Sequence, residues 1–114
     1  MKIAYVINGP AHTPMKHFAR QLGITHAVTS PFSYNFAFNP FAHQWDYMIL
    51  REIKQEMNDY GMEWDVLEGV NFIDGVKLGL ESRDEEIAHF CTLLENMGKL
   101  GIKTVCYNWM PVWG

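Results

Sequence analysis

The sequence has little that would tie it to a membrane or to nucleic acid. No apolar run approaches the roughly 20 residues that a membrane-spanning helix needs. Lysine and arginine number 9 against 13 acidic residues, and no basic run offers an electrostatic footprint for nucleic acid. Asn8-Gly9-Pro10 interrupts the N-terminal apolar stretch too early for a signal peptide. We therefore expect a cytoplasmic protein that has neither a membrane nor a nucleic acid as partner.

Cysteine is also scarce. The two cysteines are Cys91, in a helical pattern, and Cys106, in a strand pattern. Without a secretory signal such a pair predicts no disulfide framework. Because free cysteine is among the most buried residue types, we expect both to be reduced core residues. A dinucleotide-binding glycine loop is missing as well, since Asn8-Gly9-Pro10-Ala11-His12 lacks its spacing.

The composition that remains is that of a globular domain, with 48% hydrophobic and 19% charged residues in a chain of 114. A local pattern occurs in it three times: a helix-ending glycine, an apolar residue, a polar residue and then a strand. Glycine closes a helix because it enters the left-handed region at little cost. The three copies are Leu22-Gly23-Ile24-Thr25, Tyr60-Gly61-Met62-Glu63 and Leu100-Gly101-Ile102-Lys103. The pattern predicts repeated βα units, with strands over residues 2–7, 24–29, 63–68 and 102–108.

Helical patterns fill the segments between these strands. The first helix is expected to begin with Thr13 as N-cap and Pro14 at the first helical position. The third is expected to begin with a capping box, Ser82-Arg83-Asp84-Glu85. The expected buried faces are Met15, Phe18, Ala19 and Leu22 in the first helix, Ile49, Leu50, Ile53, Met57 and Tyr60 in the second, and Ile87, Phe90, Cys91, Leu94 and Met97 in the third.

Strands separated by helices run parallel with right-handed crossovers. Two architectures fit: a small open doubly wound sheet, or the first half of an eight-stranded (β/α) barrel of about 250 residues. A chain that ends on a fourth strand, where barrel enzymes place active sites, favours the half-barrel. We predict an α/β fold, (βα)3β, over residues 1–114. In it a parallel four-stranded sheet in the order 1-2-3-4 carries helices on its outer face, as the N-terminal half of a larger barrel domain.

The residues of the second half resemble a known family. The segments Val66-Leu67-Glu68-Gly69-Val70-Asn71, Val76-Lys77-Leu78-Gly79 and Cys106-Tyr107-Asn108-Trp109-Met110-Pro111-Val112 are similar to mannonate dehydratase. Three patterns of that family match them: Val-Glu-Ser-Val-Asn, Lys-Leu-Gly and Cys-Tyr-Asn-Phe-Met-Pro-Val. The chain departs from the family at Gly69, where serine is usual, and at Trp109, where phenylalanine is usual. The family's Arg-Trp-Tyr-Gly in the first strand is not visible, and its Leu-His after the second strand is replaced by Ser30-Pro31-Phe32.

The resemblance implies a xylose-isomerase-like TIM barrel that dehydrates D-mannonate to 2-keto-3-deoxy-D-gluconate, in hexuronate catabolism, with Mn²⁺ or Fe²⁺ as cofactor. In such chemistry a base removes the proton beside the carboxylate while a metal stabilises the enediolate and hydroxide leaves. The family's His, Cys and Asp metal ligands come from later strands. We therefore expect no cofactor and no dehydratase activity for this chain alone, and we assign it neither catalytic residues nor metal ligands.

Candidate substrate-binding residues follow from the expected strand ends. Glu68 and Asn108 end the third and fourth strands, and strand ends at the C-terminal face of a barrel are functional positions. Asn108 can donate and accept at once, which suits a hydroxyl or a carboxylate. Asn71 and His12 are further candidates in loops at the same face. The alternative is that these side chains only satisfy backbone groups at the barrel rim.

Long aromatic segments also belong to this face. Segments 30–45 and 69–81 follow strands, and the first contains four phenylalanines and one tyrosine besides Pro31 and Pro40. They either contact a ligand or cover the barrel mouth or an interface. Trp109, Met110 and Trp113 fit a sugar-stacking wall as well as core or interface packing.

Two further readings compete with the lyase. One is another xylose-isomerase-like sugar isomerase or epimerase fragment. The other is a half-barrel without activity that self-associates, because its first and last strands lack neighbours and exposed edges promote pairing. As partners we expect a sugar acid in the full enzyme, and either a second copy of the chain or the other barrel half.

Overall fold

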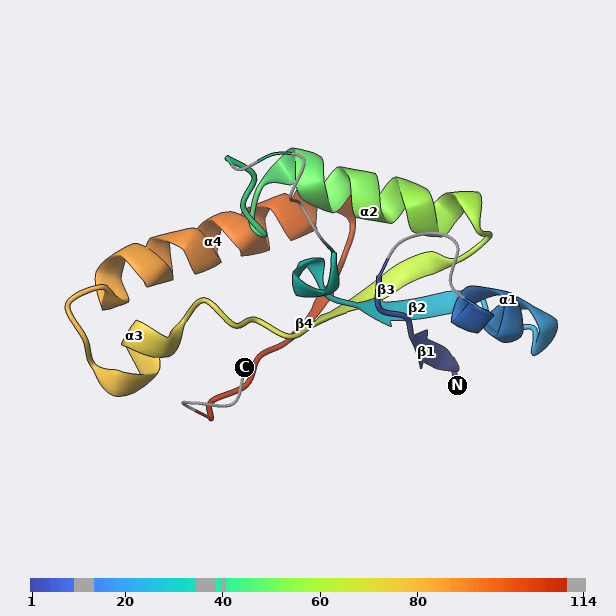
Figure 1. Ribbon diagram of the computed structural model, residues 1–114, viewed down its shortest axis with the longest axis horizontal. Coiled ribbons are helices and arrows are strands. Elements are labelled where there is room, and N and C mark those ends of the chain that lie inside the picture. The colour runs from blue at the N-terminus through green and yellow to red at the C-terminus, as the bar shows by residue number, and fades with distance from the viewer. Residues whose placement is uncertain (10–13, 35–38, 40, 111–114) are drawn as a thin grey trace.

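Four strands pair side by side in chain order. In a computed structural model that describes residues 1–9, 14–34, 39 and 41–110, they form one sheet with the order β1-β2-β3-β4 (Figure 1). Every pairing is parallel, as predicted. The strands are β1 (Ala4–Val6), β2 (His26–Thr29), β3 (Glu63–Glu68) and β4 (Thr104–Cys106). The strand β3 has the predicted bounds, whereas the other three are shorter than predicted at one or both ends.

Helices fill the connections. They are α1 (Pro14–Gln21), the 3₁₀ helix η1 (Pro31–Ser33), α2 (Tyr47–Asp59), α3 (Asp74–Leu78) and α4 (Arg83–Leu100). The short helices η1 and α3 lie in segments that the sequence analysis treated as loops. Gly23, Gly61 and Gly101 have φ angles of 72°, 72° and 75°, so the three predicted glycine caps are confirmed.

The sheet has one covered side and one open side. Figure 1 shows α2 and α4 lying along the same side of the sheet. The strand residues Ala27, Trp64 and Leu67 are buried in the core, and Val105 packs against it. On the other side Val6 is 49% exposed. The helix-covered side is therefore the outer side of the predicted half-barrel, and Val6 lies on its inner side.

The core is built mainly by α2. Its residues Ile49, Leu50, Ile53 and Met57 are all buried, as predicted from the helical pattern. They share one hydrophobic cluster with Trp64 and Leu67 of β3 and with residues of α4. Within the described part of the chain, no helix is long and apolar enough to cross a membrane.

The predicted buried face of α1 is wrong except for Ala19. Met15, Phe18 and Leu22 are exposed, and Lys16 is fully buried instead. The reason is an ion pair, since the Lys16 ammonium contacts the Glu56 carboxylate of α2 and lies 5.4 Å from the centre of the Tyr60 ring. The apolar stripe of α1 therefore faces outward. The predicted N-cap, Thr13, lies outside the described residues, while Pro14 does begin the helix.

The predicted buried face of α4 is also mostly wrong. Met97 is buried and Phe90 packs against the core, but Ile87, Cys91 and Leu94 are exposed, because α4 packs chiefly on α2 and α3. Cys91 and Cys106 are free, as predicted, but both are exposed, so their assignment to the core is wrong.

The predicted capping box does not form at the start of α4. The Ser82 side chain caps no backbone group. Its hydroxyl donates to Glu86 at 2.8 Å instead. The second Glu86 oxygen accepts the backbone N–H of Val76 at 3.1 Å, which ties the start of α4 to α3.

Candidate functional site

A cavity of about 440 Å³ opens where the strands reach their carboxyl ends. Parallel strands bring their carboxyl ends to one edge of the sheet, so residues far apart in the sequence meet there. Glu68 is the last residue of β3, Asn108 follows β4, and Asn8 follows β1. The cavity is lined by Val6, Asn8, Val28, Thr29, Ser30, Phe32, Ser33, Glu68, Gly69 and Asn108.

Hydrogen bonds across Gly69 hold this rim together. The Ser30 hydroxyl donates to the Gly69 carbonyl at 2.9 Å and accepts the backbone N–H of Phe32 at 3.2 Å. The Gly69 N–H donates to the Cys106 carbonyl at 3.4 Å. Gly69 has φ 95°, a conformation that glycine adopts at little cost. The ends of β2, β3 and β4 are therefore linked through a single glycine.

Three polar side chains in the cavity are free to bind. Asn8, Glu68 and Asn108 are exposed, and none of them forms a side-chain hydrogen bond or ion pair with another residue of the described part. Glu68 presents carboxylate oxygens, which only accept, while each asparagine amide both donates and accepts. This set can bind a ligand that offers several hydrogen-bond donors and acceptors.

The structure brings together two of the four predicted binding residues. Glu68 and Asn108 line the same cavity. Asn71 does not line it; the Asn71 Oδ1 is buried and has no hydrogen-bond partner within the described part. His12 lies outside the described residues. Sequence reasoning missed Asn8 and Ser30, although Asn8 follows β1 just as Asn108 follows β4.

The two described residues of the predicted sugar-stacking wall are not at this cavity. Trp109 lies in a separate apolar groove of about 290 Å³, with Phe90, Tyr107 and residues of α3 and α4. Its ring meets the Tyr107 ring edge-on, with centroids 6.5 Å apart. Met110 is exposed and does not line the cavity. Trp113 lies outside the described residues.

No metal centre is found among the described residues, since no three His, Cys, Asp or Glu side chains converge there. The described histidines have other neighbours. His17 meets the Tyr60 ring edge-on, and His26 lies 3.7 Å from Glu63. His43 and His89 stack on the indole of Trp45, with centroids 4.8 and 4.1 Å away. These residues do not fit the divalent metal that the resemblance implies.

Trp45 anchors the segment that leads from the cavity to α2. Besides the two histidines it contacts Phe72, with centroids 4.8 Å apart. Its backbone carbonyl accepts a hydrogen bond of 2.9 Å from the buried Asn96 side chain of α4. The segment that begins at the cavity with Ser30 is therefore fixed at its far end to α4.

A buried polar group lies beneath the rim. Tyr34 is half-buried between η1 and the core, and burial raises the pKa of its hydroxyl above the usual tyrosine range. The negative charge of Glu56 raises this pKa further, while the nearby Thr29 side chain acts in the opposite direction. Tyr34 therefore stays neutral at physiological pH and serves packing rather than proton transfer.

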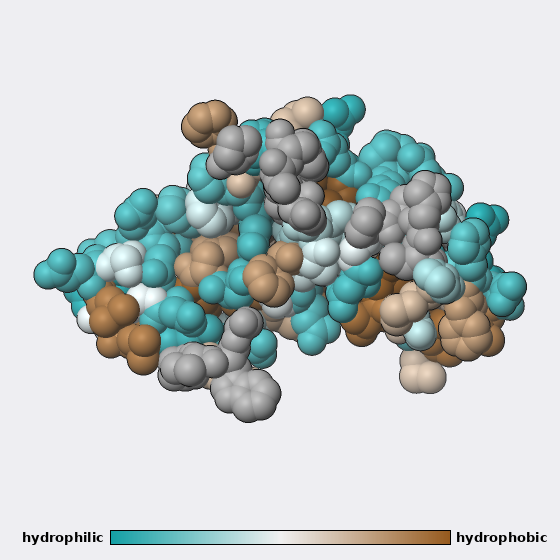
Figure 2. Space-filling view, viewed as in Figure 1, coloured by the Kyte–Doolittle hydropathy of each residue, from teal (hydrophilic) through white to brown (hydrophobic). Residues whose placement is uncertain are grey.

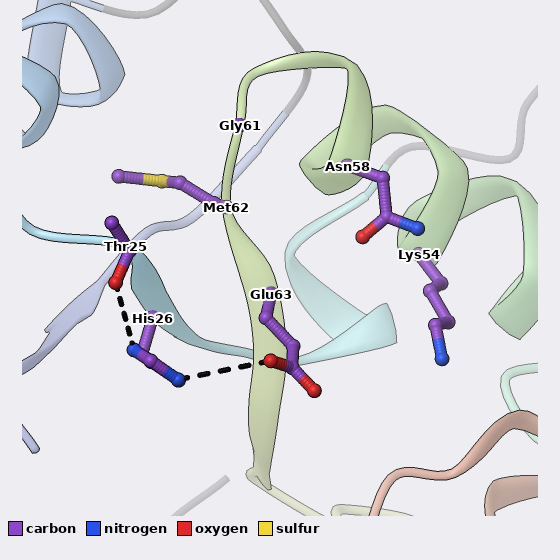
Figure 3. Close-up of a pocket in the computed structure, with 7 residues that line it drawn as sticks. All are labelled: Thr25, His26, Lys54, Asn58, Gly61, Met62 and Glu63. Carbon is purple, nitrogen blue, oxygen red and sulfur yellow. Dashed lines mark hydrogen bonds and ion pairs between the residues drawn. The ribbon is translucent and has the colours of Figure 1, made fainter.

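A second cavity, of about 490 Å³, lies at the amino ends of β2 and β3 (Figure 3). Here three of the polar side chains, those of Thr25, His26 and Glu63, contact one another. Thr25 Oγ1 lies 3.0 Å from His26 Nδ1, and His26 Nε2 lies 3.7 Å from Glu63 Oε2. Lys54 donates to the backbone carbonyl of Leu100, at the end of α4. In parallel α/β folds this end of the sheet serves stability, so its cavity is not the candidate site.

Comparison with known proteins identifies the relatives of this chain. The family described as D-mannonate dehydratase (UxuA) matches residues 1–114. Mannonate dehydratase of Brachyspira hyodysenteriae is 44% identical over 68 residues, which are 60% of this chain and 19% of that protein. Mannonate dehydratase of Thermotoga maritima is 36% identical over 73 residues, which are 64% of this chain and 20% of that protein.

A solved structure shows the same fold. The crystal structure of mannonate dehydratase from Streptococcus suis serotype 2 superposes with a TM-score of 0.75 at 26% identity. The match covers 99% of this chain and 31% of that chain. The chain thus spans about a fifth of the length of the curated relatives that it matches, and under a third of the solved one.

Proposed function

Because the chain belongs to the D-mannonate dehydratase family, we propose that it supplies the first βα units of a barrel lyase that removes water from D-mannonate. The product would be 2-keto-3-deoxy-D-gluconate. One observation carries the proposal. The free side chains of Asn8, Glu68 and Asn108 converge on a cavity at the carboxyl end of the strands, where barrel enzymes bind substrates. The match covers only a small share of the length of each relative, which supports a role for this chain as one part of a longer enzyme.

The described residues would bind and orient the substrate rather than break its bonds. Dehydration needs a base for the proton beside the carboxylate and an acid for the departing hydroxyl. Within the described part no histidine or lysine lines the cavity, so we assign neither role to this chain. The Mn²⁺ or Fe²⁺ of the family has no fitting ligand set among the described residues of this chain.

A chimeric enzyme tests the proposal. Residues 1–114 replace the matching segment of the Streptococcus suis enzyme, and formation of the 2-keto-3-deoxy acid from D-mannonate is measured. We expect turnover by the chimera, and none near ~1 per second by the isolated chain. Asn108→Ala in the chimera should lower kcat/KM by about tenfold or more, as loss of a substrate hydrogen bond does. A folded chimera without turnover, or an Asn108→Ala chimera with full activity, contradicts the proposal.

We also propose that the isolated chain self-associates, through surfaces that the rest of a barrel would cover. Met15 and Phe18 of α1, Leu22 directly after this helix and Val6 of β1 are exposed apolar residues. Figure 2 shows hydrophobic side chains gathered at the end of the molecule where Figure 1 places α1 and β1. Burial of such surface stabilises an association by about 25 cal/mol per Å². Light scattering after size exclusion at micromolar concentration should show a dimer or larger species, and a monomer would contradict this.

We also propose that the protein is cytoplasmic. Cys91 and Cys106 are free and exposed, and thiols remain reduced in that compartment. Cell fractionation of the source organism tests the placement, and recovery of the chain from a secreted or membrane fraction would contradict it.

A further inference from the structure

The candidate cavity carries charge of only one sign. Among its described lining residues Glu68 is the single acidic side chain, and no lysine, arginine or histidine is present. The buried ammonium groups elsewhere are already neutralised, since Lys16 contacts Glu56 and Lys77 lies 3.0 Å from Asp74. The lining that this chain contributes to the cavity, called the wall below, is therefore negative. It repels an anionic group placed against it.

The remaining polar groups of the wall suit hydroxyls. A carboxylate such as Glu68 has no hydrogen to donate, so its partner must be a donor, and a hydroxyl is one. The amides of Asn8 and Asn108 can each accept from one hydroxyl and donate to the next. Ser33 adds a hydroxyl, although it already donates to the Ser30 carbonyl at 2.7 Å. Val6, Val28 and Phe32 provide apolar surface for the C–H groups between the hydroxyls.

A sugar acid presents two different ends to such a wall. One end is a carboxylate, and the other is a chain of carbons that each carry a hydroxyl. We infer that the cavity formed by Asn8, Glu68 and Asn108 binds the hydroxyl-bearing carbon chain of the substrate, and that the substrate carboxylate points away from this wall. This inference rests on the proposed function and specifies how the sugar acid is oriented by the first four strands.

Binding measurements on the full 114-residue chain test the orientation. The isotope-labelled chain is titrated with D-mannitol, which is neutral, with D-mannonate, and with acetate, which has only the carboxylate. The readouts are the NMR signals of the Gly69 backbone amide and of the Asn8 and Asn108 side-chain amides. Mannitol and mannonate should shift the same signals, with mannitol bound at least as tightly, whereas acetate should shift none of them.

Two substitutions with a matched control sharpen the test. Glu68→Ala should weaken mannitol binding by about tenfold, because it removes a charged hydrogen-bond acceptor. Glu68→Gln should reduce the ratio of the mannitol affinity to the mannonate affinity by about twofold. The reason is that it removes a negative charge a few ångströms from the carboxylate of mannonate. Glu63→Gln makes the same change of charge at the opposite end of β3 and should alter neither affinity.

The outcomes separate this inference from the proposed function. If acetate and mannonate shift the three reporter signals and mannitol does not, the wall binds the carboxylate and the inference is wrong, while a role in a sugar-acid lyase stands. If mannitol binds and mannonate does not, the wall takes polyols but the proposed substrate is wrong. If none of the three ligands shifts these signals, the cavity is not a binding wall and the inference is overturned.

Discussion

The two ends of the same strands differ in how their polar side chains are used. At the amino ends, around the larger cavity, His26 lies between Thr25 and Glu63, and Lys54 donates to a backbone carbonyl (Figure 3). At the carboxyl ends Glu68 and Asn108 have no side-chain partner within the described residues. The two cavities therefore differ in how far their polar side chains are paired, and not only in size. Polar side chains that the fold leaves unpaired are the better indication of a candidate binding site, and here they lie at the carboxyl ends of the strands.

If paired polar groups stabilise the fold, then breaking the most buried pair should lower the free energy of unfolding the most. Glu56→Ala leaves the fully buried Lys16 ammonium without its counter-charge, which typically costs about 3–5 kcal/mol of unfolding free energy. Urea unfolding followed by circular dichroism measures the loss. The double variant Lys16→Met with Glu56→Gln serves as the control, because it removes both charges and should recover most of the stability. A loss below about 1 kcal/mol, the range of exposed pairs, would contradict the assigned role.

Removal of the Trp45 ring should cause the second-largest loss of unfolding free energy. Trp45→Ala removes the indole from between His43 and His89 and from its contact with Phe72, at a cost of about 2–3 kcal/mol, less than for a fully buried tryptophan. Trp45→Phe keeps an aromatic ring there and should lose less than half as much. The same unfolding experiment measures both variants. Equal stability of all three proteins would show that this segment is not anchored by the side chain.

The buried Tyr34 predicts a smaller, pH-dependent effect. Because its pKa is raised in the folded chain, the unfolded chain releases the tyrosine proton first. The stability that Tyr34 contributes is present below the ordinary tyrosine pKa of about 10 and is lost as the pH rises above it. Unfolding free energies measured between pH 8 and about 11 should therefore fall less steeply for Tyr34→Phe than for the unchanged chain. Identical slopes would mean that Tyr34 is not shielded from water.

The smallest effects on stability are expected at the two strand ends themselves. Glu63→Gln breaks an exposed contact with His26 and should cost about 0.5 kcal/mol or less. Glu68→Gln and Asn108→Ala remove no side-chain hydrogen bond or ion pair with a described residue and should leave stability within about 0.5 kcal/mol. Thermal unfolding of the three variants gives the comparison. A clear loss of stability in either carboxyl-end variant would show that these side chains serve the fold, and the contrast between the two ends would fail.

The sequence was sufficient for the architecture. The glycine caps and the apolar stretches located all four strands, and the expected strand ends placed Glu68 and Asn108 at one edge of the sheet, where both line one cavity. The predictions of the buried faces of α1 and α4 were wrong, because helical periodicity shows which residues share one face of a helix but not which neighbouring element covers that face. Lys16 was missed because a buried lysine needs a partner from another helix, and the sequence does not show that Glu56 lies opposite. Ser30 was missed because its role depends on a contact with Gly69.

That contact links two positions at which the chain departs from its family. Gly69 stands where serine is usual, and Ser30 stands where the family pattern after the second strand differs. A Cβ atom at Gly69 would lie 3.5 Å from the Ser30 hydroxyl oxygen, at a φ of +95° that disfavours a side chain. In this chain the Ser30 side chain therefore lies against the space that a side chain at position 69 would enter. Because of this contact, we expect positions 30 and 69 to change together in an alignment of close relatives.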